Sequence, residues 1–291
     1  MKKAISIWSF DPGSDFEGKL RLASDAGFAG IEVDLTVDGP VSLDSTPEEL
    51  ARVKSLADGV GIELSGLATG LYWESNPASG DPKTRTRAQR VLERQIECAS
   101  GLGIDNILVV PAAVGVDFIP GSEVVPYDVA YERAGEFLER ALPLARDHGV
   151  TICIENVWNK FLLSPLEMKA FVDSFDSSWL RVYFDVGNAL ANGYPEQWIR
   201  ILRKRIGRVH LKDYRRAVGT VDGFVDLLAG DVDWPAVVAA LEESGYDSWL
   251  TAEMIPPMPF YKHAPDTLIH NTSRAVDSIL ELGTKGMRAK S

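Results

Sequence analysis

The chain has 291 residues, of which 45% are hydrophobic and 25% are charged, a balance typical of a globular protein with a sizeable core. Thirty basic residues against 42 acidic residues leave a formal net charge of −12, which argues against nucleic acid as a partner. The sequence has no run of 18 apolar residues, so we expect no membrane span. Only two cysteines, Cys98 and Cys153, and an N-terminus without a signal-peptide pattern favour a cytoplasmic protein.

Short apolar, β-branched runs alternate with longer helical stretches along the whole chain, which is typical of βα units around a parallel sheet. Eight runs predict strands, at residues 4–10, 30–35, 62–68, 106–112, 151–157, 181–187, 208–214 and 248–254. Eight stretches predict helices, at residues 16–28, 46–61, 82–103, 127–149, 164–175, 195–206, 233–246 and 264–283.

Eight consecutive βα units predict an α/β protein with a single (β/α)8 TIM barrel over residues 1–291. We expect residues 284–291 to form a loose tail. An open doubly wound sheet would usually carry a glycine-rich fingerprint after its first strand, and the segment FDPGSD at 10–15 has none.

Polar residues at the carboxyl ends of barrel strands are the candidates for an active site. Four such residues end the last four predicted strands: Glu155, Asp185, His210 and Glu253. Three carboxylates in one half-buried site would repel one another unless a cation neutralised them. Hard oxygens with one imidazole suit Mn²⁺ best, with Mg²⁺ or Co²⁺ as alternatives. Any one of these acids taken alone could instead cap a helix or form a salt bridge.

Three further residues near the predicted strand ends have two interpretations each. Lys212 lies two positions beyond His210 and therefore on the same strand face, where it could reach a substrate oxygen or pair with a site acid such as Glu253. Trp8 could cover the apolar face of a ligand or belong to the core. Glu32 could lie near the barrel mouth or be buried against a partner.

The segments GIEVDL, TICIENVWNKF, VYFDVGNA, RVHLKD and LTAEM resemble the xylose-isomerase-like TIM-barrel sugar isomerase/epimerase family, particularly its ketose 3-epimerases and sugar-phosphate epimerases. The resemblance runs from Ile5 to about Gly283. It places the family's metal ligands on the same four strand-end residues and its acid/base pair on Glu155 and Glu253.

The resemblance also implies substrate contacts. Arg216, six residues after His210, matches an arginine that binds substrate hydroxyls in the 3-epimerases. Asn188 stands three residues after Asp185, where those epimerases commonly have a histidine. Asparagine can hydrogen-bond a hydroxyl or carbonyl but cannot titrate near neutral pH.

These features predict a metal-dependent epimerase of a sugar or sugar phosphate, most simply acting at C3 of a ketose or ketose phosphate. One glutamate would take the C3 proton to give a cis-enediolate, and the other would return a proton to the opposite face. An aldose–ketose isomerase, a keto-sugar dehydratase or lyase, and an inactive sugar-binding barrel are the alternatives. The sequence leaves a homo-oligomer open. Four histidines are too few for the family's three-zinc endonucleases.

Overall fold

The computed structural model describes residues 1–255 and 261–288 of the chain. By its contacts the chain divides into two compact units. The first unit contains Met1–Glu32, Ser55–Ser65 and Phe184–Ser291, and the second contains Val33–Lys54 and Gly66–Tyr183. That the chain forms a single domain stays a prediction.

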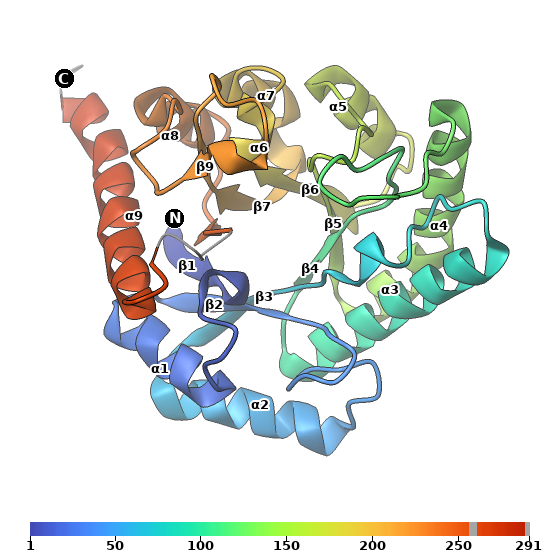
Figure 1. Cartoon of the computed structure of the whole chain (residues 1–291), viewed down its shortest axis with the longest axis horizontal. Helices are drawn as coiled ribbons and strands as arrows, with labels where there is room; N and C mark the ends of the chain where they lie inside the picture. The colour runs from blue at the N-terminus through green and yellow to red at the C-terminus, as the bar shows by residue number, and fades with distance from the viewer. Residues whose placement is uncertain (256–260, 289–291) are drawn as a thin grey trace. The chain divides into compact units, whose positions relative to one another are not determined.

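Each of the eight apolar runs overlaps a parallel strand, and most residues of each strand are buried, as expected for a parallel sheet. The strands are β1 (Lys2–Ser6), β2 (Gly30–Asp34), β3 (Glu63–Ala68), β4 (Asn106–Val109), β5 (Thr151–Glu155), β6 (Leu180–Asp185), β7 (Ile206–Leu211) and β10 (Trp249–Ala252) (Figure 1). Their hydrogen-bonded order is β1-β10-β7-β6-β5-β4-β3-β2, that of a closed barrel. This order confirms the α/β class and the (β/α)8 topology.

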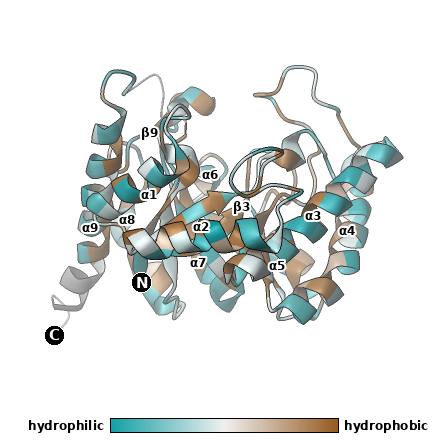
Figure 2. Ribbon diagram, turned by 90° about the horizontal axis from the view of Figure 1, so that it is seen from below, coloured by the Kyte–Doolittle hydropathy of each residue, from teal (hydrophilic) through white to brown (hydrophobic). Residues whose placement is uncertain are grey.

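Eight helices follow the strands at the predicted stretches. They are α1 (Phe16–Asp25), α2 (Pro47–Val60), α3 (Pro82–Leu102), α4 (Tyr127–His148), α5 (Pro165–Asp173), α7 (Pro195–Leu202), α8 (Trp234–Glu243) and α9 (Pro265–Arg288). In the first unit α8 packs against α7 and α9, and in the second α3 packs against α4. Figure 2 shows hydrophilic and hydrophobic residues on the same helices, as expected when one face is buried.

Helix ends follow the local sequence. The side chains of Asp15, Asp81 and Ser164 each accept a backbone N–H in the first turn of the helix that follows. Gly103 and Gly149 end α3 and α4 with φ of 75° and 68°, a left-handed conformation that favours glycine. The expected tail needs a correction, because α9 continues through Arg288. Residues 289–291 lie outside the described part of the chain.

The structure adds short elements that periodicity does not predict, among them the following. The first predicted strand stops at Ser6 and turns into a 3₁₀ helix, η1 (Ile7–Ser9). A short helix, α6 (Val186–Leu190), follows β6 directly. An antiparallel pair, β8 (Asp213–Tyr214) and β9 (Phe224–Val225), follows β7. Each is too short to show a period in sequence.

Within the described residues, no helix combines the length and the apolar composition that a membrane span requires.

Candidate active site

Three of the predicted ligands come together in the first unit, at the carboxyl ends of its strands. Asp185 is the last residue of β6, His210 lies in β7, and Glu253 directly follows β10. Strands β7 and β10 pair with His210 opposite Thr251, and the backbone N–H of Glu253 donates to the carbonyl of Leu211. All three functional side chains are buried. The strand register therefore fixes their backbones before any ligand binds.

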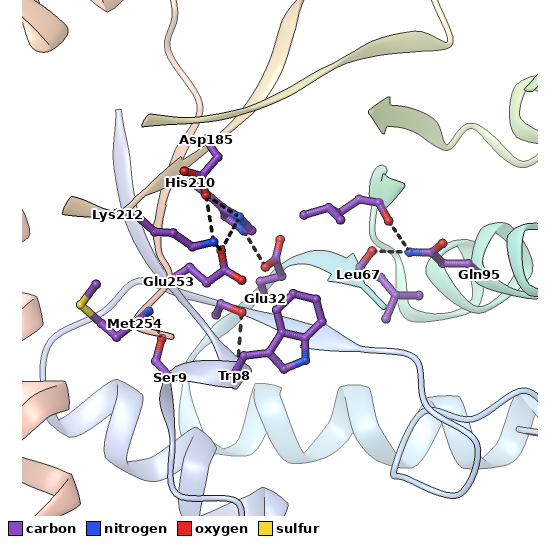
Figure 3. Close-up of polar contacts among 12 residues, drawn as sticks. Trp8, Ser9, Glu32, Leu67, Gln95, Asp185, His210, Lys212, Glu253 and Met254 are labelled. Carbon is purple, nitrogen blue, oxygen red and sulfur yellow. Dashed lines mark hydrogen bonds and ion pairs between the residues drawn. The ribbon is translucent and has the colours of Figure 1, made fainter. Parts of the chain in front are cut away.

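His210 lies at the centre of this cluster (Figure 3). Its Nδ1 is 3.1 Å from Glu253 Oε2 and 3.9 Å from Asp185 Oδ2, and its Nε2 is 2.9 Å from Glu32 Oε1. A carboxylate only accepts hydrogen bonds, so Glu32 is the acceptor for His210 Nε2. Nδ1 is the ring nitrogen that faces the other two acids, and it is the atom that would bind a metal ion when the ring carries its only proton on Nε2.

Lys212 supplies the positive charge nearest to the same acids. Its Nζ lies 2.5 Å from Glu253 Oε2 and 3.2 Å from Asp185 Oδ2, and the side chain is buried. The ion-pair interpretation of Lys212 is thus confirmed. Gly187 of α6 permits this placement, since a Cβ there would stand 2.5 Å from the Cβ of Lys212.

Burial and charge act differently on the two acids. Burial raises the pKa of Asp185, and Lys212 and His210 only partly offset it. Burial also opposes ionisation of Glu253, but Lys212 and His210 outweigh it and lower the pKa of Glu253 to about 2. Glu253 is therefore ionised at neutral pH, and Asp185 ionises more easily when a further cation is near.

Glu155 belongs to the second unit. It is buried at the end of β5, where it pairs in register with Tyr183 of β6, two residues before Asp185 on the same strand. In the described part of the chain, the acidic and histidine side chains that could together hold a metal ion are Glu155, Asp185, His210 and Glu253. Carboxylate oxygens with one imidazole fit a hard or borderline divalent ion such as Mn²⁺.

The predicted substrate contacts lie at three places. Trp8 is half-buried in η1, where its backbone N–H donates to Ser6 Oγ. Asn188 is buried in α6, and its backbone N–H donates to Asp185 Oδ1 at 2.7 Å. Their roles in substrate binding stay predictions.

Arg216 is exposed on the loop after β8. Its guanidinium donates to the carbonyl of Gly193 at 3.3 Å and lies 4.8 Å from the ring centroid of Tyr194, while its backbone N–H donates to Asp231. These contacts hold Arg216 beside the loop that follows α6. Substrate binding by Arg216 likewise stays a prediction.

The roles of two residues of the site, Glu32 and Asp213, become clear only in the structure. Glu32 is fully buried in β2 and fixes His210, and a charge inside an apolar strand was its only signal in the sequence. Asp213 is also buried and accepts hydrogen bonds from four donors: the backbone N–H groups of Tyr214, Leu228 and Val232 and the indole Nε1 of Trp234. Asp213 thereby holds the loop after β7 in place. No local sequence pattern predicts this role of Asp213.

A family model described as xylose isomerase-like TIM barrel matches residues 20–270. The chain belongs to this family. An L-ribulose-5-phosphate 3-epimerase of Escherichia coli O1:K1 is 25% identical over 242 residues, which cover 78% of each chain. A 2-epi-5-epi-valiolone 7-phosphate 2-epimerase of an Actinoplanes species is 26% identical over 215 residues, covering 72% of this chain and 71% of that one.

Solved structures show the same fold. The D-psicose 3-epimerase of Clostridium cellulolyticum superposes with a TM-score of 0.81 over 97% of this chain and 99% of its own, at 18% identity. At that identity the likeness concerns the fold alone. Together with the family match it confirms the fold and the family that the motifs predicted.

Proposed function

We propose that the chain is a metal-dependent epimerase of a ketose or ketose phosphate that acts at C3. The observation that carries the proposal is the convergence of His210 Nδ1, Asp185 Oδ2 and Glu253 Oε2 in one buried cluster. The curated relatives support the reaction class, since both are named as epimerases of phosphorylated compounds. We further propose a cytoplasmic enzyme whose partner is the small sugar itself, while a homo-oligomer stays a prediction.

Glu155, Asp185, His210 and Glu253 are the residues that would hold the metal ion, with Mn²⁺ favoured by the donor set. When bound, a divalent ion supplies a Lewis acid that stabilises negative charge on substrate oxygens. Glu32 supports this set, because it keeps the proton of His210 on Nε2 and leaves Nδ1 as the ligand atom.

Proton transfer at C3 falls to Glu155 and Glu253, each buried at the end of its strand. One removes the proton from C3 and the other delivers a proton to the opposite face, which inverts the carbon. Trp8, Asn188, Lys212 and Arg216 are the candidates for binding substrate hydroxyl and carbonyl groups. An isomerase or a dehydratase would also begin by removing a proton from a carbon next to the carbonyl, and an isomerase would move that proton between C1 and C2.

Exchange of substrate hydrogen with D₂O tests this function. We expect the Mn²⁺-loaded protein to place deuterium at C3 of at least one member of a panel of ketoses and ketose phosphates, read by NMR. Chelation of the metal, Glu155→Gln or Glu253→Gln should each abolish exchange. Glu136→Gln, on a side chain 65% exposed in a surface ion pair, is the matched control and should exchange normally.

Other outcomes separate the alternatives. Exchange only at C1 or C2 would assign an aldose–ketose isomerase, and loss of water from the sugar would assign a dehydratase. Tight metal binding with no exchange on any sugar would replace the enzyme proposal by a sugar-binding barrel.

A further inference from the structure

Two carboxylate oxygens of the cluster each face two different nitrogen atoms. Asp185 Oδ2 and Glu253 Oε2 are the oxygens nearest to His210 Nδ1, and they are also the oxygens that accept from Lys212 Nζ at 3.2 Å and 2.5 Å. The atoms best placed to hold a metal ion are therefore already engaged by an ammonium group. A divalent cation and an ammonium beside the same oxygens repel each other.

A cavity borders Lys212. Among the described residues it is lined by Lys212, Phe224, Asp226, Glu253 and Tyr261, with Met254 and other apolar neighbours. Lys212 Nζ is 5.4 Å from the ring centroid of Phe224, within the range of a cation–π contact. The hydroxyl of Tyr261 donates to Asp226 Oδ2 at 2.7 Å, which holds that carboxylate at the cavity wall.

We propose that Lys212 is a displaceable internal cation: its ammonium neutralises Asp185 and Glu253 in the metal-free protein and turns toward the Phe224 and Asp226 cavity when a divalent ion takes their oxygens. This inference rests on the metal-dependent function proposed above. In its position on the two acids the ammonium already lies 5.4 Å from the ring centroid of Phe224, and Asp226 lines the same cavity, which the flexible lysine stem also borders. The loop that carries the second position is the one that Asp213 fastens.

The proposal makes two opposite predictions for one substitution. Lys212→Met keeps the length of the side chain and removes its charge. The metal-free protein should melt at a lower temperature, because two buried carboxylates lose their counter-ion. Mn²⁺ should bind more tightly, because the ion no longer has to displace an ammonium group. A lysine that merely supported the metal site would lower metal affinity when removed.

Calorimetric titration of the chelator-treated full chain with MnCl₂ measures Mn²⁺ affinity. Thermal melting of the same protein measures the stability of the metal-free state. For Lys212→Met we expect about tenfold tighter Mn²⁺ binding and a larger Mn²⁺-induced rise in melting temperature than in the unsubstituted protein. Lys160→Met is the matched control, since Lys160 forms an exposed ion pair with Asp117 at 2.5 Å. It should leave both quantities unchanged.

A double-mutant cycle with Asp226→Asn tests where the ammonium goes, and the single Asp226→Asn variant remains informative if Lys212→Met does not fold without metal. Asparagine can still accept from Tyr261 but no longer attracts a displaced ammonium. We expect Asp226→Asn alone to weaken Mn²⁺ binding about threefold, with no effect in the Lys212→Met background. Equal effects in both backgrounds would show that Asp226 acts independently of Lys212 and would overturn the second position.

The outcomes also separate this inference from the proposed function. Unchanged or weaker Mn²⁺ binding by Lys212→Met, with normal binding by the unsubstituted protein, would overturn the displaceable lysine and leave the metal-dependent function standing. Failure of both proteins to bind Mn²⁺ would overturn the two together.

Discussion

Two buried polar clusters, one in each unit, use opposite chemistry (Figure 3). In the second unit Gln95 of α3 is fully buried, and its Nε2 donates to the carbonyls of Leu67 and Leu108, both at 2.9 Å. Its Oε1 accepts from the hydroxyl of Tyr72 at 2.9 Å. Every group in this cluster is neutral, and both amide hydrogens and the amide oxygen have partners.

The cluster in the first unit concentrates charge instead. Within its contacts, three carboxylates surround one lysine and one imidazole, and two of the acids share the same cation. A satisfied neutral cluster stabilises the native state and offers nothing to a ligand. Charged groups that converge on one point cost stability when buried, and they supply the binding and proton transfer that a neutral cluster cannot. This contrast separates the structural role of the neutral cluster from the catalytic role that we propose for the charged one.

The largest expected effect comes from breaking the charged cluster at Glu253. Glu253→Gln removes the proposed base and one proposed ligand atom, so we expect kcat/KM to fall by about 10³-fold or more. Steady-state kinetics on the substrate found by deuterium exchange measures this. A drop below tenfold with unchanged metal content would show that Glu253 is neither base nor ligand.

The partner of His210 should matter next. Glu32→Gln replaces a pure acceptor by an amide that can also donate to Nε2, so the ring loses the tautomer that presents Nδ1. We expect Mn²⁺ affinity to fall about 10- to 100-fold, measured by calorimetry. Glu63→Gln, on an exposed pair with Lys2, serves as the control. An unaltered affinity would mean that the tautomer of His210 is set by another group.

A substitution in the neutral cluster should lower the stability of the protein and leave its catalytic activity unchanged. Gln95→Ala leaves two buried carbonyls and a tyrosine hydroxyl without this partner, so we expect the free energy of unfolding to fall by about 2–3 kcal/mol. Urea denaturation measures it, with Gln89→Ala on the same helix as control. Activity per folded molecule should stay unchanged, and a selective loss of activity would contradict the structural role.

The smallest expected effect concerns the hydroxyl of Tyr127 and the dependence of stability on alkaline pH. Burial first, and then the bond that the Tyr127 hydroxyl donates to Glu167 at 2.6 Å, raises the pKa of Tyr127 to about 12. Because the folded pKa exceeds the usual 10, the stabilisation is complete below pH 10 and is lost as pH rises through about 12.

Alkaline melting curves test this pH dependence. Tyr127→Phe should lose stability less steeply than the unsubstituted protein between pH 10 and 12. Tyr194→Phe, on a tyrosine 52% exposed, should follow the unsubstituted curve. If stability fell equally steeply with pH in all three proteins, ionisation of Tyr127 would not contribute to the loss of stability at alkaline pH.

Local patterns were enough to identify the strands, the helices and the acids that end the strands. Each strand contains at least three consecutive buried residues, and Asp185 and Glu253 mark the point where such a run meets the polar end of the sheet. These features involve residues that are neighbours in the sequence, so the spacing of the side chains carries them. Short elements such as α6 and the β8–β9 pair lack the length to show a period.

Which side chains meet across the fold could come only from the tertiary structure. His210 and Glu32 are 178 positions apart, and their contact depends on where two separate strands end. The two interpretations of Lys212 were equally consistent with its position in the sequence, and only the folded structure places its ammonium beside Asp185 and Glu253. The amino-acid pattern thus determines which residues reach the end of a strand, and three-dimensional packing determines which charges share a cation, because electrostatic interactions depend on distance in space.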